Sequence, residues 1–228
     1  MEETEKDLAI FEGDRATNYD NFVQQWIPNY DYFMSILPSL LKTSPEKSLL
    51  AVGCGTGTEL RTLKDVDDTW SILGIDPSPE MIRIARKKLT LYEDIELVIG
   101  EVSQLKNQKK YGAATLILVL HFIKYPKEKL ALLIEIQKRL KPEAPLIIMG
   151  IFGSKEQLKG NLRILEALLP DDLTQKEIEE RLERITNSLY RTTEEELEKL
   201  VMRAGFEKPT RFFQSSIYGA YTTKKLIL

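Results

Sequence analysis

Apolar and polar residues follow two patterns along the chain: short apolar runs, and longer segments with helical spacing. Five short runs rich in aliphatic and β-branched residues predict strands over residues 48–53, 71–75, 95–99, 114–120 and 145–151. Segments of helical period follow the first, second and fourth of these runs. This alternation predicts an α/β fold with a mostly parallel sheet.

The pattern changes after the fifth predicted strand. Residues 154–190 form a charged helical segment with one narrow apolar stripe. The stripe consists of Ile178, Leu182, Ile185 and Leu189. Thr193 and Glu196 then predict a helix start by a capping box, and Gly205 predicts the end of that helix. Two short β runs around Ser215 and Ser216 predict an antiparallel hairpin.

Composition narrows the classes of protein that the chain can belong to. Of its 228 residues, 43% are hydrophobic and 29% are charged, which suits one globular domain and excludes disorder. A single cysteine, Cys54, excludes an internal disulfide, and a single histidine, His121, leaves little for a metal centre. The formal charge of −3 does not demand a nucleic-acid partner. No apolar stretch is long enough to span a membrane, and the acidic N-terminus does not resemble a signal peptide, so we expect a cytoplasmic protein.

The segment LLAVGCGTGTEL, residues 49–60, carries the most chemical information. It places Gly53, Gly55 and Gly57 between a predicted strand and a predicted helix. Glycines at this spacing let the backbone turn tightly and approach a ligand, and the helix that follows presents N–H groups. The simpler interpretation, a turn without a ligand, needs only one or two glycines. The loop therefore predicts a nucleotide-type site.

The type of nucleotide depends on spacing and on the next strand. A dinucleotide fingerprint would place glycine at position 58, where the chain has Thr58, and a phosphate-binding P-loop sequence does not occur. Asp76 ends the second predicted strand, 23 residues after Gly53. A carboxylate there can accept hydrogen bonds from both hydroxyls of a ribose. The alternative is that Asp76 or Ser78 caps the following helix.

These residues carry a resemblance. VGCGTGTEL, GIDPSPEMI and IGEVSQL resemble the successive motifs of class I S-adenosylmethionine-dependent methyltransferases. The resemblance implies an α/β, Rossmann-like, seven-stranded, mostly parallel sheet with an antiparallel C-terminal hairpin and a helical insertion. It also implies S-adenosylmethionine as cofactor and S-adenosylhomocysteine as product. The cofactor-binding residues that it implies are Gly53, Cys54, Gly55, Thr56, Gly57, Asp76, Pro77, Met81, Glu101 and Val102.

One position departs from that family. Two residues before Gly53, where the family usually carries an acid that helps to order the cofactor's ammonium side, this chain has Ala51. The departure implies either weaker cofactor binding or a substitute from elsewhere in the chain. Met81 has a second interpretation as a core residue of an amphipathic helix.

Both ends of the chain are similar to carboxy-S-adenosylmethionine-dependent tRNA wobble-uridine methyltransferases. Pro28-Asn29-Tyr30 matches their Pro-Gly-Tyr, so the similarity implies that Tyr30 reaches the cofactor, with Tyr19 as a second covering residue. Their arginine that clamps the extra carboxylate falls on Leu182, between Arg181 and Arg184. We therefore expect ordinary S-adenosylmethionine.

His121 follows the fourth predicted strand, where the methyl group would be transferred. A neutral imidazole there is a candidate general base, and the alternative is a loop residue that bonds the backbone. Cys54 is expected to be a buried structural thiol.

We accordingly expect an S-adenosylmethionine-dependent methyltransferase with a small-molecule acceptor and no membrane partner. Two alternatives remain: a tRNA wobble-uridine methyltransferase and a non-catalytic cofactor-binding module. The expected parts are an N-terminal helical cover, a cofactor-binding core, a lid or homodimer insertion, and a terminal helix with its hairpin. They span 1–44, 45–151, 152–192 and 193–228.

Overall fold

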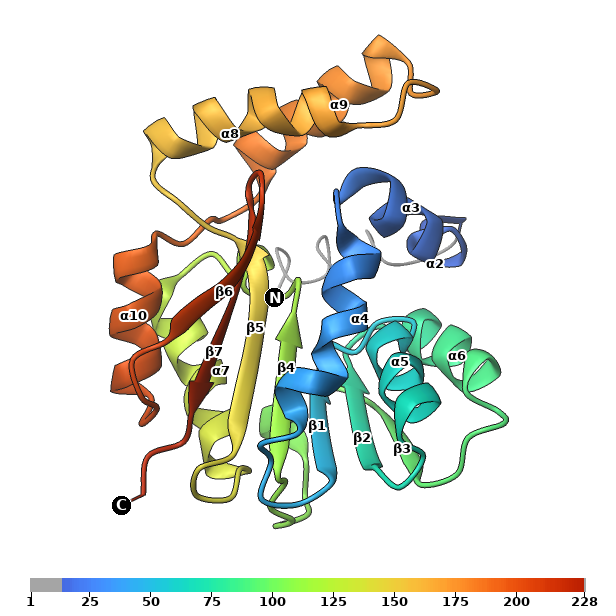
Figure 1. Cartoon of the computed structure of the whole chain (residues 1–228), viewed down its shortest axis with the longest axis vertical. Coiled ribbons are helices and arrows are strands. Elements are labelled where there is room, and N and C mark those ends of the chain that lie inside the picture. Colours follow the sequence, from blue (N-terminus) through green and yellow to red (C-terminus); the bar gives the residue numbers. More distant parts are fainter. Residues whose placement is uncertain (1–13, 228) are drawn as a thin grey trace.

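One seven-stranded sheet organises residues 14–227, the part of the chain that this computed structural model describes (Figure 1). Residues 1–13 of the expected N-terminal cover lie outside the described part. The strand order is β3-β2-β1-β4-β5-β7-β6, with β1 to β5 parallel and β7 antiparallel to both of its neighbours. The strands are β1 Ser48–Val52, β2 Ser71–Asp76, β3 Ile95–Ile99, β4 Ala113–Ile117, β5 Pro145–Ile151, β6 Thr210–Ser215 and β7 Tyr218–Lys224.

Strand β1 shows why the central strands are apolar throughout. Successive side chains of a strand point to opposite faces of the sheet. Leu49 and Ala51 join one hydrophobic cluster, whereas Leu50 and Val52 join the other. Every residue of β1, β4 and β5 is buried because helices cover both faces.

Two groups of helices cover the sheet, one on each face (Figure 1). Helices α4, α5 and α6 pack on the first face, and α7 and α10 pack on the second. These helices are α4 Tyr30–Leu41, α5 Thr58–Val66, α6 Pro79–Lys88, α7 Pro126–Lys138 and α10 Glu194–Arg203. The chain enters through two shorter helices, α2 Asp14–Thr17 and α3 Tyr19–Trp26. None of the helices within 14–227 has the length and hydropathy of a membrane span.

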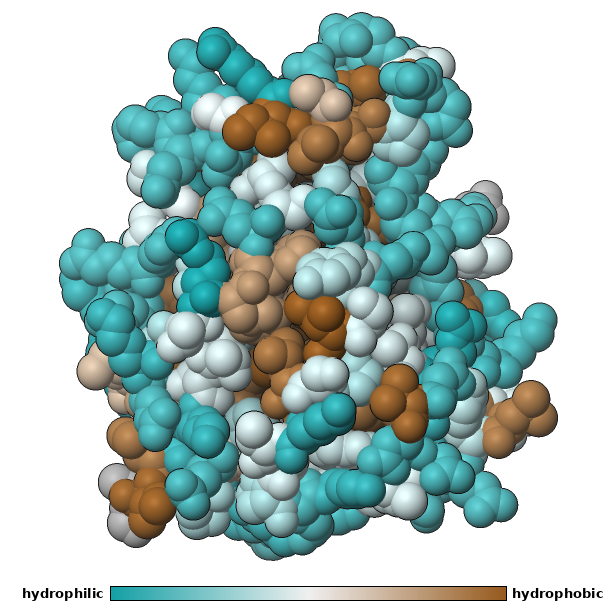
Figure 2. All heavy atoms as spheres, in the orientation of Figure 1, coloured by the Kyte–Doolittle hydropathy of each residue, from teal (hydrophilic) through white to brown (hydrophobic). Residues whose placement is uncertain are grey.

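The predicted insertion forms a helical hairpin above the sheet, α8 Lys155–Leu168 and α9 Gln175–Ser188 (Figure 1). We call this hairpin the lid. Both of its helices begin with a capping box. Leu165 and Ile185 are buried, while Ile164 and Leu168 are half exposed and add to the apolar surface of the lid (Figure 2).

Two strands end earlier than predicted because of backbone conformation, and two other boundaries differ by one residue. The fourth strand ends at Ile117 rather than at residue 120, since Leu118 has φ of +59° and a 3-10 helix spans Leu120–Phe122. The first strand ends at Val52 because Gly53 has φ of +69°. The predicted C-terminal hairpin is confirmed as β6 and β7.

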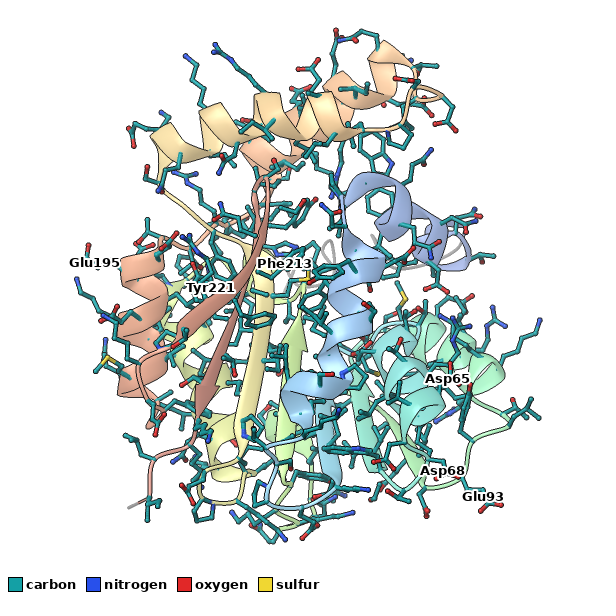
Figure 3. All side chains as sticks on the ribbon, in the orientation of Figure 1. Asp65, Asp68, Glu93, Glu195, Phe213 and Tyr221 are labelled. Carbon is teal, nitrogen blue, oxygen red and sulfur yellow. The ribbon has the colours of Figure 1, made fainter. Side chains whose placement is uncertain are left out.

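Two aromatic contacts tie the hairpin to the rest of the molecule. The Phe213 ring lies 5.5 Å from the Phe33 ring of α4, and the Tyr221 ring lies 5.1 Å from the Phe152 ring after β5. Figure 3 shows Phe213 and Tyr221 on the hairpin strands, below the lid. The labelled acids Asp65, Asp68 and Glu93 lie far from the lid. In Figure 1 the lid lies above the carboxyl ends of the parallel strands, where the glycine loop follows β1 and Asp76 ends β2.

Candidate functional site

The glycine loop connects β1 to α5 at the carboxyl edge of the sheet. Gly53, Gly55 and Gly57 have φ angles of +69°, +50° and +78°. A Cβ on Gly53 would lie 2.3 Å from Cγ2 of Val119, and one on Gly57 would lie 2.8 Å from Cδ1 of Leu89. Close approach and left-handed backbone therefore both require glycine at these two positions.

Gly55 differs from its two neighbours. The nearest atom to a Cβ on Gly55 would be the Tyr19 ring edge, at 3.9 Å. The backbone of Gly55 is therefore open toward α3, as a loop that receives a ligand requires.

Asp76 ends β2 directly beside this loop. Its Oδ2 accepts a hydrogen bond from the Gly55 N–H at 2.8 Å, and its Oδ1 accepts one from the Ser78 N–H at 2.9 Å. Burial raises the pKa of Asp76, and these two donors oppose the rise. Each carboxylate oxygen can accept a second hydrogen bond, so the geometry is compatible both with a ribose ligand and with the turn role that the sequence left open.

The residues predicted to surround the adenine occupy different environments. Pro77 and Glu101 are exposed, whereas Met81 and Val102 are each 2% exposed. Gln104 accepts a hydrogen bond from the backbone N–H of Glu101 at 2.8 Å, and the exposed Glu101 carboxylate accepts one from the Ser103 hydroxyl at 3.4 Å. Pro77 and Met81 thus follow β2, and Glu101 and Val102 follow β3, at the carboxyl edge of the sheet.

An ion pair fastens α3 to the glycine loop. Asp20 pairs with Lys88 of α6 at 2.5 Å and accepts hydrogen bonds from Thr56 at 2.5 Å and Thr58 at 3.1 Å. Burial raises the pKa of Asp20, but the bonds from Lys88 and Thr56 outweigh it, so the pKa is lowered overall. We call Asp20, Lys88, Thr56 and Thr58 the clasp. It holds the N-terminal cover over the loop.

The two predicted covering tyrosines both face this region. Burial raises the pKa of both Tyr19 and Tyr30, and the charge of Glu59 adds to the rise. Asn29, which stands where the similar family has glycine, has φ of +64°, a conformation that asparagine tolerates better than most residues. The Pro28-Asn29-Tyr30 segment therefore keeps the turn of a Pro-Gly-Tyr segment and starts α4 at Tyr30.

His121 lies within the 3-10 helix that follows β4 and is 5% exposed. Its Nδ1 has no hydrogen-bond partner among the described residues. Burial, followed by the charges of Arg181 and Lys129, lowers the pKa of His121 to about 3. The imidazole is therefore neutral at ordinary pH.

Arg181 was not among the predicted site residues, yet α9 directs it inward. Its Nη2 donates to the Tyr218 hydroxyl at 3.3 Å, and its guanidinium lies 4.7 Å from the centre of the Phe22 ring. Its Nε is buried and unpaired within residues 14–227. Helical spacing already contained the signal, because Arg181 is three residues after Ile178 and four before Ile185, on the face of the apolar stripe.

Glu59 is a second residue that motif reasoning missed. It lies in the first turn of α5 and is 6% exposed. Its spacing of four from buried Leu63 was the signal that it faces inward. Cys54 is buried as predicted, and burial raises the pKa of its thiol well above the usual value, which suits a structural role.

A family described as "Methyltransferase domain" matches residues 50–146. Residues 50–146 therefore resemble a methyltransferase domain. The domain contains the glycine loop, Asp76 and His121. It therefore includes both the predicted cofactor side and the predicted transfer point.

The chain is similar to proteins of two kinds, a carboxy-S-adenosyl-L-methionine synthase and methyltransferases. Carboxy-S-adenosyl-L-methionine synthase of Campylobacter curvus is 29% identical over 203 residues, which are 86% of each chain. Human N-acetylserotonin methyltransferase in complex with SAM has a TM-score of 0.68 at 17% identity over 96% of this chain. PigF with SAH has a TM-score of 0.67 at 18% identity over 96% of this chain. The chain spans 58% and 62% of those two structures. The predicted Rossmann-like methyltransferase fold is confirmed.

Proposed function

We propose that the chain binds S-adenosylmethionine along the glycine loop and Asp76, and transfers its methyl group to a small anionic acceptor beneath the lid. The proposal rests on one observation above all. Six buried side-chain atoms of the described residues have no hydrogen-bond partner, although buried polar groups are normally satisfied. Two of the six, Nδ1 of His121 and Nε of Arg181, belong to residues near enough for the charge of Arg181 to lower the pKa of His121. A ligand that supplies both partners explains them.

The cofactor side fits this proposal. When bound, S-adenosylmethionine supplies a methyl group on a positively charged sulfur, from which a nucleophile can displace it. Asp76 would accept hydrogen bonds from the ribose hydroxyls, and the N–H groups of the loop and of α5 would face the ligand. Tyr19, over Gly55, would keep water away from the bound groups.

On the acceptor side, Arg181 would pair with an anion and hold it beneath the lid. His121 would take, at Nδ1, the proton that the attacking oxygen or nitrogen loses as its bond to the methyl carbon forms. The bond between that carbon and sulfur would break at the same time, and its electron pair would stay on sulfur. An anion beside Arg181 would also raise the pKa of His121, because it offsets the positive charge that now lowers this pKa.

The ion pairs that the basic residues of α6 already form favour a small acceptor over tRNA. Arg83 pairs with Glu80 at 2.6 Å, and Lys88 pairs with Asp20 in the clasp. Two of the four basic side chains in residues 83–88 therefore already have acidic partners. The rest would make a weak phosphate-binding patch.

A second candidate follows from the relatives named carboxy-S-adenosyl-L-methionine synthase. In that case the anion beside Arg181 would belong to a carboxyl donor. The methyl carbon on sulfur would lose a proton and form a bond to the carboxyl carbon. The bond between the donor and its carboxyl group would break, the donor would keep the electron pair and take up a proton, and the product would be a carboxylated sulfonium compound rather than S-adenosylhomocysteine. Similarity over 86% of both chains favours this candidate, and so does the inward guanidinium.

Mass spectrometry separates the two candidates. The protein is incubated with S-adenosylmethionine and a panel of small carboxylic acids. A methylated acid together with S-adenosylhomocysteine supports the proposal, and carboxy-S-adenosylmethionine supports the second candidate. Binding of S-adenosylmethionine without product supports a non-catalytic module. Calorimetry that detects no binding of the cofactor or of S-adenosylhomocysteine rejects all three.

Variants then test the acceptor side. We expect His121→Gln to reduce turnover about 10²-fold or more while cofactor affinity stays the same. Arg181→Met should raise KM for the acceptor, whereas Lys176→Met, on an exposed face of the same helix, should change neither constant. Equal effects of the two α9 variants would contradict the proposed role of Arg181.

A further inference from the structure

Glu59 is a buried acid that the proposed transfer reaction does not use. It lies two residues after Gly57, in the first turn of α5, and only 6% of its surface is exposed. Its charge raises the pKa of three groups around the glycine loop: Tyr19, Tyr30 and Cys54. The carboxyl group therefore lies within the region that the loop, α3 and α4 enclose.

The three acids of this region differ in their partners. Asp76 accepts from two backbone N–H groups, and Asp20 accepts from three side chains of the clasp. For Glu59, within the described residues, the one hydrogen bond that lowers its pKa comes from its own backbone N–H. Lys88, whose charge also lowers this pKa, is already hydrogen-bonded to Asp20. Glu59 is thus the one acid of the three without a donor from another residue.

Burying the Glu59 carboxyl group costs free energy, which a bound ligand can offset. Burial without a partner disfavours the charged form, and it raises the pKa of Glu59 to about 8. An apolar residue of similar size would avoid the cost of burying a carboxyl group. A cationic ligand group removes that cost, because it pairs with the carboxylate once the proton has left.

We propose that Glu59 binds the α-ammonium group at the amino-acid end of the cofactor. The inference rests on the proposed function, in which the glycine loop binds S-adenosylmethionine. Ala51, under the loop, offers no side-chain acceptor, whereas the N–H groups at the start of α5 suit the carboxylate of the same amino-acid end. Glu59 and the helix start would therefore bind the two opposite charges of one ligand group.

This pairing predicts the release of a proton. Below pH 8 the Glu59 carboxyl of the ligand-free protein holds its proton. On binding, the carboxyl becomes a carboxylate beside the ligand ammonium, and the proton passes to the buffer. The charged or titratable groups that face Glu59 are Tyr19 and Asp20 from α3, Tyr30 from α4, Cys54 from the loop, Asp76 from β2 and Lys88 from α6.

A pair of ligands distinguishes binding of the amino-acid end from binding of the adenosine. S-adenosylhomocysteine carries the ammonium, and 5′-methylthioadenosine has the same adenosine and thioether without it. We expect Glu59→Gln to weaken S-adenosylhomocysteine about 10- to 100-fold in calorimetry, since a hydrogen bond to a charged group is lost. Binding of 5′-methylthioadenosine should not change. The matched control, Asp76→Asn, should weaken both ligands by similar factors.

Proton release provides a second readout that needs no variant. At pH 7, the binding enthalpy of S-adenosylhomocysteine to the wild-type protein should change between buffers of different ionisation enthalpy, with about one proton released. The enthalpy for 5′-methylthioadenosine should not change, and Glu59→Gln should abolish the buffer dependence.

The inference is overturned if Glu59→Gln binds S-adenosylhomocysteine as tightly as the wild type. It is also overturned if the variant loses both ligands equally, or if the wild type releases no proton. In each of these cases the wild type still binds S-adenosylhomocysteine, so the proposed function stands. If the wild type binds neither ligand, the proposed function fails together with the inference.

Discussion

The two sides of the site differ in how their polar groups are satisfied. On the glycine-loop side, Asp76 accepts from two backbone N–H groups, and Asp20 lies in the clasp. On the lid side, His121 and Arg181 each keep a buried atom without a partner among residues 14–227.

The glycine-loop side is therefore already organised without a ligand, whereas the lid side is not. Groups that pair with one another hold the loop in place without a ligand. Unpaired buried groups carry a desolvation cost that a ligand can offset, and this favours a site whose chemistry is completed by its acceptor. Glu59 is an exception on the glycine-loop side, which is why we assign it to a ligand.

The largest expected effect tests the rigidity of the loop. Gly53→Ala should lower the free energy of unfolding by about 2–4 kcal/mol, because left-handed backbone and contact with Val119 both disfavour a Cβ. Gly55→Ala is the matched control and should cost about 1–2 kcal/mol, from its backbone alone. Urea unfolding measures both. Equal losses would show that the two glycines do not differ as their surroundings indicate.

Asp76→Ala should weaken S-adenosylmethionine binding by about 1–3 kcal/mol, since ribose hydroxyls would lose their acceptor. Calorimetry measures this change. Ser78→Ala, which removes a helix cap beside it, should affect stability and leave affinity nearly intact. Unchanged affinity in Asp76→Ala would remove Asp76 from the site and leave it only its turn role.

Removing the clasp should have a smaller effect. Asp20→Asn and Lys88→Met should each lower stability by about 1 kcal/mol, because the Asp20 side chain is 40% exposed and solvent weakens the pair. A double-mutant cycle should show coupling of similar size that decreases with salt. Additive losses would mean that the pair does not fasten α3 to the loop.

The smallest expected effect is a change in the pKa of His121. Because the chain has one histidine, one imidazole signal should be followed by nuclear magnetic resonance. The wild-type pKa should be about 3, and Arg181→Met should raise it by less than about one unit, or about 1.4 kcal/mol, because burial is the larger cause. An unchanged pKa would show that Arg181 does not act on His121.

The same pKa determines how stability depends on pH. The folded protein binds fewer protons at His121 than the unfolded chain does between about pH 3 and pH 6.5. The contribution of this residue to stability should therefore fall as pH decreases through that range. Arg181→Met should make the decrease slightly smaller.

Much of the cofactor side could be predicted because its signals are local. Gly53, Gly55 and Gly57 follow a buried strand directly, and Asp76 ends the next strand. Parallel strands bring their carboxyl ends to one edge of the sheet, so these positions meet without further information. The strand limits were less predictable, since the turn at Leu118 depends on the backbone of one apolar residue.

Arg181 and Glu59 could not be assigned in this way. Helical spacing shows that each faces inward, but it does not show what each would meet. Arg181 reaches Tyr218, 37 residues away along the chain, and Glu59 lies near residues of three other elements. Burial and charge at such positions depend on how the lid and the N-terminal helices are packed.

The sheet, the glycine loop and the acid beside it could be predicted from the sequence, because they follow from periodicity and from backbone conformations that glycine allows. Which charged groups are desolvated, and which of them have hydrogen-bond partners, depends on the packing of the folded chain. Desolvation is a property of the packed molecule, so the low pKa of His121, the raised pKa of Glu59 and the inward guanidinium of Arg181 emerge only when distant elements come together.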